Sequence, residues 1–131
     1  MEDKSSKRIM VDMSATLIHH GHIRLLKRAS SYGNVIVALT TDEEILLKKG
    51  YQPELSFDFR REILLSIKYV NEVIPSPWLI DEDFLDLNRI DFLIHGSDNS
   101  NPISKKRLII FERTEGISSS ILRERVRQII N

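Results

Sequence analysis

Residues 35–39 read Val-Ile-Val-Ala-Leu, an unbroken apolar run of five residues. Such a run is typical of a strand with both faces buried, as in a parallel sheet. It is followed closely by Thr41-Asp42-Glu43-Glu44, in which a threonine at a helix cap precedes a glutamate by three residues. This capping box predicts a short helix that extends to about Lys49 and ends at Gly50. The stretch therefore predicts a buried strand that leads directly into a helix.

The same alternation of short apolar runs with helical patterns continues on both sides of this stretch. Further strands are predicted at residues 9–11, 72–74, 90–94 and 108–111, and further helices at 20–32, 57–70, 81–87 and 118–130. The last helix is expected to place Leu122, Val126, Ile129 and Ile130 on one face. Strands that alternate with helices predict an α/β fold, a parallel sheet covered on both faces. Ligands of such sheets bind at the carboxyl ends of the strands, where the strand order reverses.

Length and charge narrow the class of protein. The 131 residues are enough for one domain, with residues 1–7 as a flexible tail and residues 8–131 as the folded part. Lys plus Arg and Asp plus Glu both number 19, so the formal net charge is zero. A protein that binds nucleic acid normally carries a basic excess, so no nucleic-acid partner is expected.

The chain contains no cysteine, which excludes a disulfide framework, a thiolate nucleophile and a zinc–cysteine site. Its longest apolar run, residues 35–39, is far too short to span a membrane. Residues 1–8 are polar and lack the apolar core of a signal peptide. We therefore expect a cytoplasmic protein with no membrane partner.

Three of the four histidines fall within His19-His20-Gly21-His22, at the expected start of the first helix. His19 and His22 share a face of a helical turn, whereas His20 should point away. Backbone N–H groups at a helix start favour an anion, and two imidazole donors beside them suit a phosphate whose charge grows during reaction. A metal site and a set of plain surface histidines are the alternative interpretations.

The loop before the last helix reads Arg113-Thr114-Glu115-Gly116-Ile117-Ser118-Ser119-Ser120. Its arginine offers a planar donor fork suited to phosphate, and its glycine allows a tight turn. The serines can cap the helix or offer hydroxyls to a phosphate. Helix capping alone, with the arginine in a surface ion pair, would produce the same pattern.

Other polar residues stand at the same predicted edge of the sheet. Lys49 closes a short helix and is either a solvated partner of the helix dipole or a lysine that folds over the site. The segment His95-Gly96-Ser97-Asp98 follows a strand and should lie near the first loop, across the point where strand order reverses. Trp78, the only tryptophan, is either a packing lid or a wall for a ligand.

Taken together, these segments resemble the cytidylyltransferase family, whose members act on glycerol-3-phosphate, choline phosphate and ethanolamine phosphate. The resemblance runs from about Arg8 to Arg125. The histidine segment matches the H-x-G-H signature, and the last loop matches R-T-x-G-I/V-S-S/T. Lys49-Gly50 is similar to the segment that carries the mobile lysine, and residues 95–98 to the H-G-x-D segment of the ethanolamine-phosphate enzymes. The resemblance implies a Rossmann-like, three-layer nucleotidyltransferase domain with a five-stranded parallel sheet.

The resemblance also implies an activity, transfer of CMP from CTP to a small phosphorylated or phosphonate acceptor with release of pyrophosphate. It implies a homodimer, and Mg²⁺ as cofactor, held on the triphosphate rather than by protein ligands. His19, His22, Lys49 and Arg113 would carry catalysis. The residues implied for nucleotide binding are Ser14, Ala15, Gly21, His95, Gly96, Asp98, Thr114, Gly116, Ile117, Ser118 and Ser119.

One segment departs from the family pattern. The family has glycine, a variable residue and Phe-Asp shortly before the first histidine, where this chain has Met13-Ser14-Ala15-Thr16. The departure alters the floor of the expected pocket. Two alternatives therefore stay open, namely an adenylyltransferase of the same superfamily that uses ATP, and a non-catalytic nucleotide-binding protein.

The acceptor is the least determined part of this interpretation. Asp12 ends the first strand, and the choline- and ethanolamine-phosphate enzymes have an aspartate at the similar position. A carboxylate there would attract an ammonium group, and Trp78 could add a cation–π wall. We therefore expect Asp12 and Trp78 to bind an amine-bearing phosphorylated acceptor, although Asp12 could equally cap the first loop.

Overall fold

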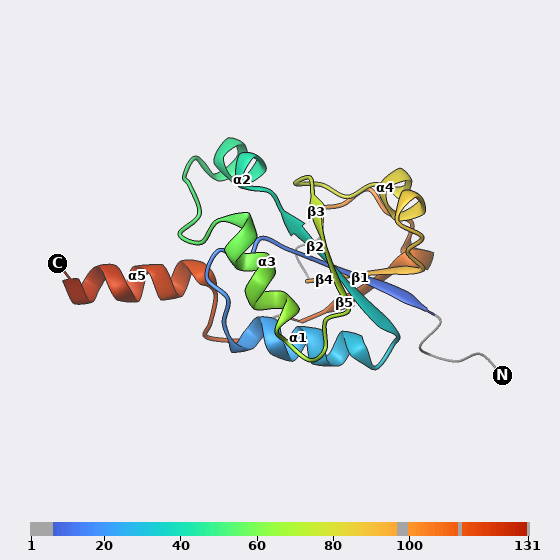
Figure 1. The fold of residues 1–131 in the computed structure, drawn as a ribbon, viewed down its shortest axis with the longest axis horizontal. Helices are drawn as coiled ribbons and strands as arrows, with labels where there is room; N and C mark the ends of the chain where they lie inside the picture. Colours follow the sequence, from blue (N-terminus) through green and yellow to red (C-terminus); the bar gives the residue numbers. More distant parts are fainter. Residues whose placement is uncertain (1–6, 97–99, 113, 131) are drawn as a thin grey trace.

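Five parallel strands form a single sheet in the order β3-β2-β1-β4-β5 (Figure 1). The computed structural model describes residues 7–96, 100–112 and 114–130. Its strands are β1 (Arg8–Met13), β2 (Asn34–Thr40), β3 (Glu72–Ser76), β4 (Phe92–Gly96) and β5 (Leu108–Phe111). Its helices are α1 (His20–Ser30), α2 (Asp42–Lys49), α3 (Phe57–Leu65), α4 (Glu82–Leu87) and α5 (Ser119–Ile130), with a 3₁₀ turn, η2 (Lys105–Arg107). The expected five-stranded parallel sheet is confirmed.

The strand order reverses between β1 and β4. Val11 of β1 lies opposite Val37 of β2 on one side and opposite Ile94 of β4 on the other. The loops after these strands therefore open at one edge of the sheet, at the switch point where α/β folds bind ligands. His95 and Gly96, which are the last residues of β4, thus lie beside the first loop, as the sequence predicted, whereas Ser97 and Asp98 of the same segment lie outside the described residues.

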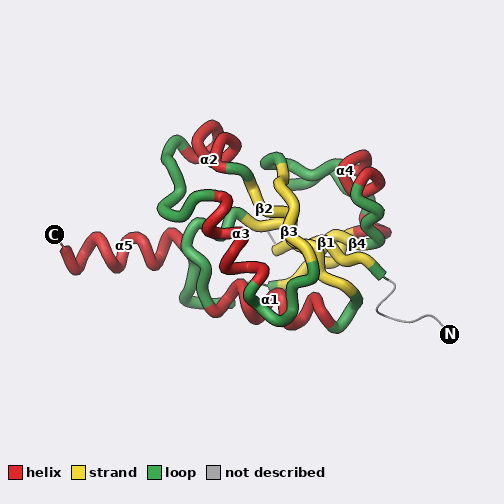
Figure 2. Tube along the Cα trace, in the orientation of Figure 1, coloured by secondary structure: helices red, strands yellow, loops and turns green. Residues whose placement is uncertain are grey.

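Alternate residues of the central strands bury on opposite faces of the sheet, as the pleat requires. On one face Ile9, Val11 and Val37 pack with Leu26 of α1 and Leu64 of α3. On the other face Met10, Ile36 and Ala38 pack with Leu85 of α4. Figure 2 shows the strands between these helices, so the fold has three layers and both faces of the sheet are covered.

Several elements begin or end away from their predicted bounds. α3 ends at Leu65 rather than at residue 70, because Ile67 and Val70 donate their N–H groups only three residues back, in successive tight turns. The fourth strand begins at Phe92 rather than at residue 90, because Ile90 N–H is bonded to Leu85 O at the end of α4. The first helix ends at Ser30, two residues before its predicted end.

Only half of the predicted capping box forms at α2. Thr41 caps the helix by accepting a hydrogen bond from Glu44 N–H at 3.3 Å. The reciprocal bond is missing because Thr41 N–H is already bonded to Ser76 O of β3, at 3.2 Å. The Glu44 carboxylate instead accepts a hydrogen bond from Trp78 N–H at 3.0 Å. A residue expected to cap its own helix thus fixes the segment that follows β3.

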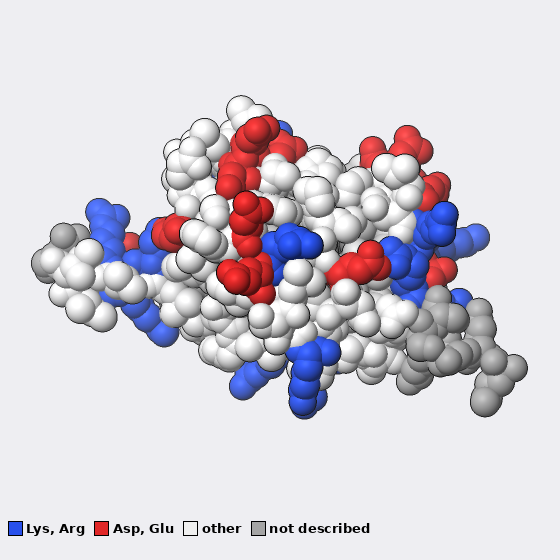
Figure 3. Space-filling model, in the orientation of Figure 1, with Lys and Arg blue, Asp and Glu red and all other residues white. Residues whose placement is uncertain are grey.

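Helix α5 extends away from the rest of the fold (Figure 1), and none of its described residues is buried. The predicted apolar face is largely in solvent, with Val126 55% and Ile129 82% exposed. Lys and Arg side chains mark this helix in Figure 3, whereas acidic side chains gather over α2 and α3 on the face drawn. The apolar pattern was sufficient to predict the helix, but within one chain it has no packing surface.

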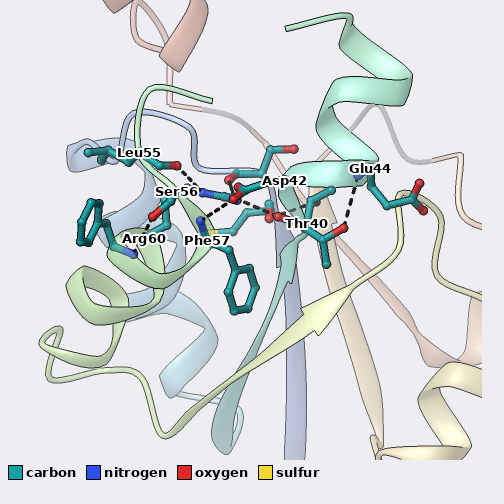
Figure 4. A network of polar contacts seen from close by, with 11 residues as sticks. Thr40, Asp42, Glu44, Leu55, Ser56, Phe57 and Arg60 are labelled. Carbon is teal, nitrogen blue, oxygen red and sulfur yellow. Dashed lines mark hydrogen bonds and ion pairs between the residues drawn. The ribbon is translucent and has the colours of Figure 1, made fainter. Parts of the chain in front are cut away.

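The charged side chain of Arg60, on α3, is completely buried where β1 and β2 end (Figure 4). Its guanidinium donates to Ser14 O at 2.6 Å, to Thr40 O at 2.9 Å and to Leu55 O at 3.0 Å. A fourth bond reaches the Asp42 carboxylate at 2.6 Å, which supplies the compensating charge that a buried cation needs. One side chain thus fixes three segments around the carboxyl edge of the sheet.

We expect Arg60→Met to lower the free energy of unfolding by at least about 3 kcal/mol, because three backbone carbonyls and a carboxylate lose their donor. Urea denaturation followed by circular dichroism would measure this. Arg61→Met is the matched control, because Arg61 is the exposed neighbour on the same helix. Equal stability of the Arg60 and Arg61 variants would contradict this account.

Candidate functional site

A cavity of about 620 Å³ opens at the carboxyl edge of the sheet. The sequence-predicted residues that line it are Asp12, Ser14, Ala15, His19, Gly21, His22, Lys49, Trp78, His95, Gly96, Thr114, Ile117, Ser118 and Ser119. Gly116 does not line it but forms the turn before α5, with a φ of +76° that favours glycine. Asp98 and Arg113 lie outside the described residues. The first and last loops, about a hundred residues apart in the chain, thus meet at one cavity.

His19 and His22 cap the helix that carries them. His19 Nδ1 accepts a hydrogen bond from Gly21 N–H at 3.1 Å, and His22 Nδ1 accepts one from His19 N–H at 3.1 Å. A ring nitrogen that accepts a bond is unprotonated, so in each neutral ring the proton resides on Nε2. Their ring centroids are 4.0 Å apart. The backbone at the start of α1 therefore selects the tautomer that offers an N–H donor, and two such donors lie side by side.

The two rings are also held neutral. Burial lowers the pKa of His22 to about 4, with a further contribution from the neighbouring His19. Burial also lowers the pKa of His19, and His20 adds to the effect. At neutral pH both rings therefore act as neutral donors in the free protein. His20 is exposed and does not line the cavity.

Gly21 is needed for this arrangement. A Cβ atom at this position would lie 2.9 Å from His19 Cε1 and 3.0 Å from His19 Nδ1. It would also lie 3.3 Å from Ile117 Cγ2, in the loop before α5. Any side chain would therefore displace the capping ring or the facing loop. Gly21 therefore leaves the space in which the His19 ring can lie against the backbone N–H that it caps.

The serines at the start of α5 have different tasks. Ser118 caps the helix, since its hydroxyl oxygen accepts a hydrogen bond from Ile121 N–H at 3.0 Å. The Ser119 hydroxyl donates to Leu17 O at 2.8 Å and accepts from Leu17 N–H at 3.2 Å. Ser119 therefore fastens α5 to the loop that precedes His19, in addition to lining the cavity.

Asp12 and His95 meet across the switch point. The Asp12 Oδ1 atom lies 2.5 Å from His95 Nδ1, and Asp12 Oδ2 accepts a hydrogen bond from Asn101 Nδ2 at 3.3 Å. The Asn101 side chain is itself anchored, because its oxygen accepts a bond from Ile80 N–H at 2.7 Å. Both carboxylate oxygens of Asp12 are thus engaged by the protein. The sequence offered no means to identify Asn101, which comes from an irregular segment after β4.

Lys49 and Trp78 both line the cavity and lie next to each other. Lys49 ends α2 rather than standing in a loop, and Gly50 follows it with a φ of +78°. The Lys49 Nζ atom is 5.7 Å from the centre of the Trp78 ring system, within the range of a cation–π interaction. The tryptophan surface expected to receive a ligand cation is therefore already faced by a lysine.

Sequence reasoning missed further cavity residues, among them Thr40, Ser100, Phe111 and Glu112. Two more, Arg24 and Arg28, extend from Gly21 along one face of α1, a spacing of three and four residues that could have identified them. The Arg28 guanidinium lies 3.9 Å from the centre of the Phe111 ring. Within the described ranges, no group of three or more His, Asp or Glu side chains could hold a metal ion.

Comparisons with known proteins agree on a single family. The family described as "Cytidylyltransferase-like" matches residues 14–125. The chain is 36% identical over 126 residues to glycerol-3-phosphate cytidylyltransferase of Staphylococcus aureus, covering 90% of this chain and 93% of the relative. It is 32% identical to the Bacillus subtilis enzyme of the same name, covering 92% and 97%. It is 33% identical to ethanolamine-phosphate cytidylyltransferase of Arabidopsis thaliana, but spans only 30% of that protein.

A solved structure is similar in fold. The lipopolysaccharide core biosynthesis protein from Thermoplasma volcanium aligns with a TM-score of 0.69 over 83% of this chain and 98% of that one. Its sequence identity is 16%, so the likeness is one of fold alone. No helix in the described part of the chain is long and apolar enough to cross a membrane.

The low pKa of His22 predicts how stability depends on pH. The unfolded chain binds a proton at His22 near pH 6.5 and the folded chain only near pH 4, so stability is full above 6.5 and falls as pH drops. The total loss is about 3 kcal/mol. His22→Gln retains an acceptor but does not titrate, so its stability should fall by about 2 kcal/mol less than that of the wild type between pH 7 and 4.5.

Urea denaturation at several pH values would test this, with His20→Gln as the exposed control. Parallel pH profiles for the wild type and the His22 variant would contradict a buried neutral ring.

Proposed function

The chain belongs to the cytidylyltransferase-like family, and we propose that it transfers CMP from CTP to a small phosphorylated acceptor, with release of pyrophosphate. The observation that carries this proposal is the pair of neutral histidines, whose Nε2–H donors are set by backbone caps at a helix start. Donors fixed before substrate binds are most effective where negative charge grows during a reaction.

The proposed reaction needs no covalent enzyme intermediate. An oxygen of the acceptor phosphate attacks the α-phosphorus of CTP in line, a new P–O bond forms, and the bond to the β-phosphate oxygen breaks to release pyrophosphate. The protein contributes positioning and charge neutralisation. His19 and His22 donate to the triphosphate, and the start of α5 with Ser118 and Thr114 borders the same end. Lys49 and Arg113 neutralise charge on the reacting phosphates.

Magnesium belongs to the proposal as an ion carried on the nucleotide. We propose that it is held by triphosphate oxygens and water, the ligands that Mg²⁺ usually keeps in phosphoryl-transfer sites. When bound, it would neutralise charge on the phosphate oxygens. Lys49 and Arg113 contribute the protein's share of that neutralisation, and the two neutral histidines contribute hydrogen bonds.

For the acceptor, we propose a phosphorylated polyol such as glycerol 3-phosphate ahead of the amine-bearing acceptor expected from the sequence. The relatives matched over nearly their whole length are named for glycerol-3-phosphate. The two features that favoured an amine are already engaged by the protein, Asp12 by His95 and Asn101, and Trp78 by Lys49. An amine-bearing or phosphonate acceptor stays open as the alternative.

We also propose a homodimer in the cytoplasm. The exposed apolar side chains of α5, including Val126 and Ile129, offer a surface that a second copy would cover. Light scattering coupled to size-exclusion chromatography would give the mass in solution.

Nucleotide and acceptor choice are tested together by measuring pyrophosphate release from CTP and ATP with glycerol 3-phosphate, phosphoethanolamine and aminoethyl phosphonate. We expect turnover with CTP and none with ATP, since cytosine-selective polar groups are left unpaired by the wrong base. We expect kcat/KM to be higher for glycerol 3-phosphate than for phosphoethanolamine. Faster turnover with ATP would favour an adenylyltransferase, and CTP binding without turnover would favour a non-catalytic protein.

Asp12→Asn separates the two acceptor classes further. If the acceptor carries an amine, this variant should lower the ratio of kcat/KM for phosphoethanolamine to that for glycerol 3-phosphate. If Asp12 is occupied by His95, as the geometry indicates, that ratio should stay within about twofold of the wild-type value, a difference of about 0.4 kcal/mol.

Replacing His19 or His22 by Ala should lower kcat by roughly 10²–10³-fold, the scale of losing one preorganised donor. Lys49→Ala should lower kcat more than it weakens CTP binding, because its charge is worth most in the transition state. Steady-state kinetics and calorimetric titration with CTP would separate these effects. His20→Ala is the control, and comparable damage from it would refute the assigned roles.

A further inference from the structure

Arg123, on the second turn of α5, contacts two segments of the chain that are distant from α5 in the sequence. Its guanidinium binds the Glu54 carboxylate with two nitrogens, Nε to Oε2 and Nη2 to Oε1, the latter at 2.7 Å. Nη2 also donates to Thr16 Oγ1 at 3.1 Å. The guanidinium carbon lies 4.6 Å from the centre of the Tyr51 ring. No other described arginine of α5 has such a set of contacts.

The neighbouring arginines of the same helix make this distinction clear. Arg127 is 72% exposed and meets only Glu124 of its own helix, at 3.9 Å. Arg125 donates a hydrogen bond to Gly116 O at 3.5 Å, in the turn directly before α5. Arg123 is 31% exposed, and its hydrogen bonds hold the pKa of Glu54 below its usual range. The pair is bidentate and joins distant segments, which is the geometry in which a partly exposed ion pair contributes most.

The two segments joined by Arg123 are next in the chain to Lys49, the lysine of the cavity, and to His19, one of its two histidines. Tyr51 and Glu54 belong to residues 50–56, which follow Lys49 across the left-handed Gly50. Thr16 is 1% exposed and lies three residues before His19. Thr16 is also the position at which the family pattern has an acidic residue, so the departure at this position places a hydroxyl acceptor under the arginine.

Lys49 is joined directly to residues 50–56. It is the last residue of α2, is exposed, and has no hydrogen bond or ion pair within the described chain. The far end of the same segment is fixed by Asp42, which accepts a hydrogen bond from Phe57 N–H at 3.1 Å. The middle of the segment is held by Arg123. Without that hold, the turn after Gly50 is tied down only at its ends.

We propose that Arg123 is a positioning residue that clamps residues 51–54 to α5 and thereby holds Lys49 over the cavity, facing Trp78. The proposal rests on the proposed function for the catalytic importance of Lys49, but the clamp itself does not. Because α5 begins at the phosphate-binding loop, the clamp places that loop, the lysine and the segment before His19 in one fixed arrangement. Precise positioning of this kind is valuable because small misplacements of a catalytic group slow reactions strongly.

The clamp is tested first without any reaction. Arg123→Met retains an unbranched side chain similar to the apolar stem of arginine but removes its charge and its donors, and Arg127→Met is the matched control on the same helix. Hydrogen exchange of the amides of residues 50–56 should be about tenfold faster in the Arg123 variant. Emission from Trp78, the only tryptophan, should move toward that of Lys49→Ala. Unchanged exchange and unchanged emission would overturn the clamp.

Kinetics then separate positioning from general damage. Arg123→Met should lower kcat by about tenfold to a hundredfold while leaving the Kd for CTP within about threefold, and Arg123→Lys should restore part of the loss. The double variant Arg123→Met/Lys49→Ala should be no slower than Lys49→Ala alone, because a clamp has no effect without the group it holds. Multiplying losses would overturn the proposal.

Two further outcomes keep the test decisive. If Arg123→Met is poorly folded by urea denaturation, Glu54→Gln removes the same ion pair from the other side and should give the same exchange and emission changes. If the wild type shows no cytidylyl transfer with any acceptor, the proposed function fails, and the exchange and emission measurements alone decide the clamp.

Discussion

The buried guanidinium of Arg60 lies where three backbone carbonyl groups point toward the same place, one just after β1, one at the end of β2 and one in the loop before α3. Parallel strands converge at one edge of a sheet, and backbone acceptors left there without donors would each destabilise the fold. The planar guanidinium of Arg60 supplies these donors, with hydrogen bonds to Ser14 O, Thr40 O and Leu55 O. Its positive charge is paired with the Asp42 carboxylate. The shape of the cavity floor follows from this arrangement, because Ser14 and Thr40 both line the cavity.

Hydrogen bonds to the backbone also determine the properties of the two cavity histidines, because they fix the orientation and the tautomer of each ring. His19 and His22 use Nδ1 to satisfy N–H groups at the start of α1, so their remaining nitrogens must be donors. Burial then disfavours the imidazolium form. A helix start normally relies on serine or aspartate for this purpose. Here the capping residues are also residues of the candidate site, so the loss of either ring would alter both the helix start and the cavity.

Much of this could be predicted from the sequence, because the signals involved are local. The apolar run at residues 35–39 and the alternation around it were sufficient to predict the parallel sheet, and the histidine and serine segments were sufficient to predict which loops line the cavity. The failures have two physical causes. A residue distant in sequence competes for Glu44, which bonds Trp78 rather than its own cap, and local turns with bonds three residues back end α3 early. Nothing local distinguishes Arg60 from Arg61, although one is fully buried and the other exposed.

The hydrogen bonds between Ser119 and Leu17 affect the order in which the protein folds during its synthesis. Its two hydrogen bonds join residues 102 positions apart, and Arg123 bonds Thr16 across 107 positions. Closing loops of that length carries an entropy cost that local contacts do not, so such pairings form late in folding. On the ribosome, strands β1 to β4 and α1 are synthesised well before the helix that completes the cavity. A nascent chain therefore has no finished cavity until residues 114–123 have emerged.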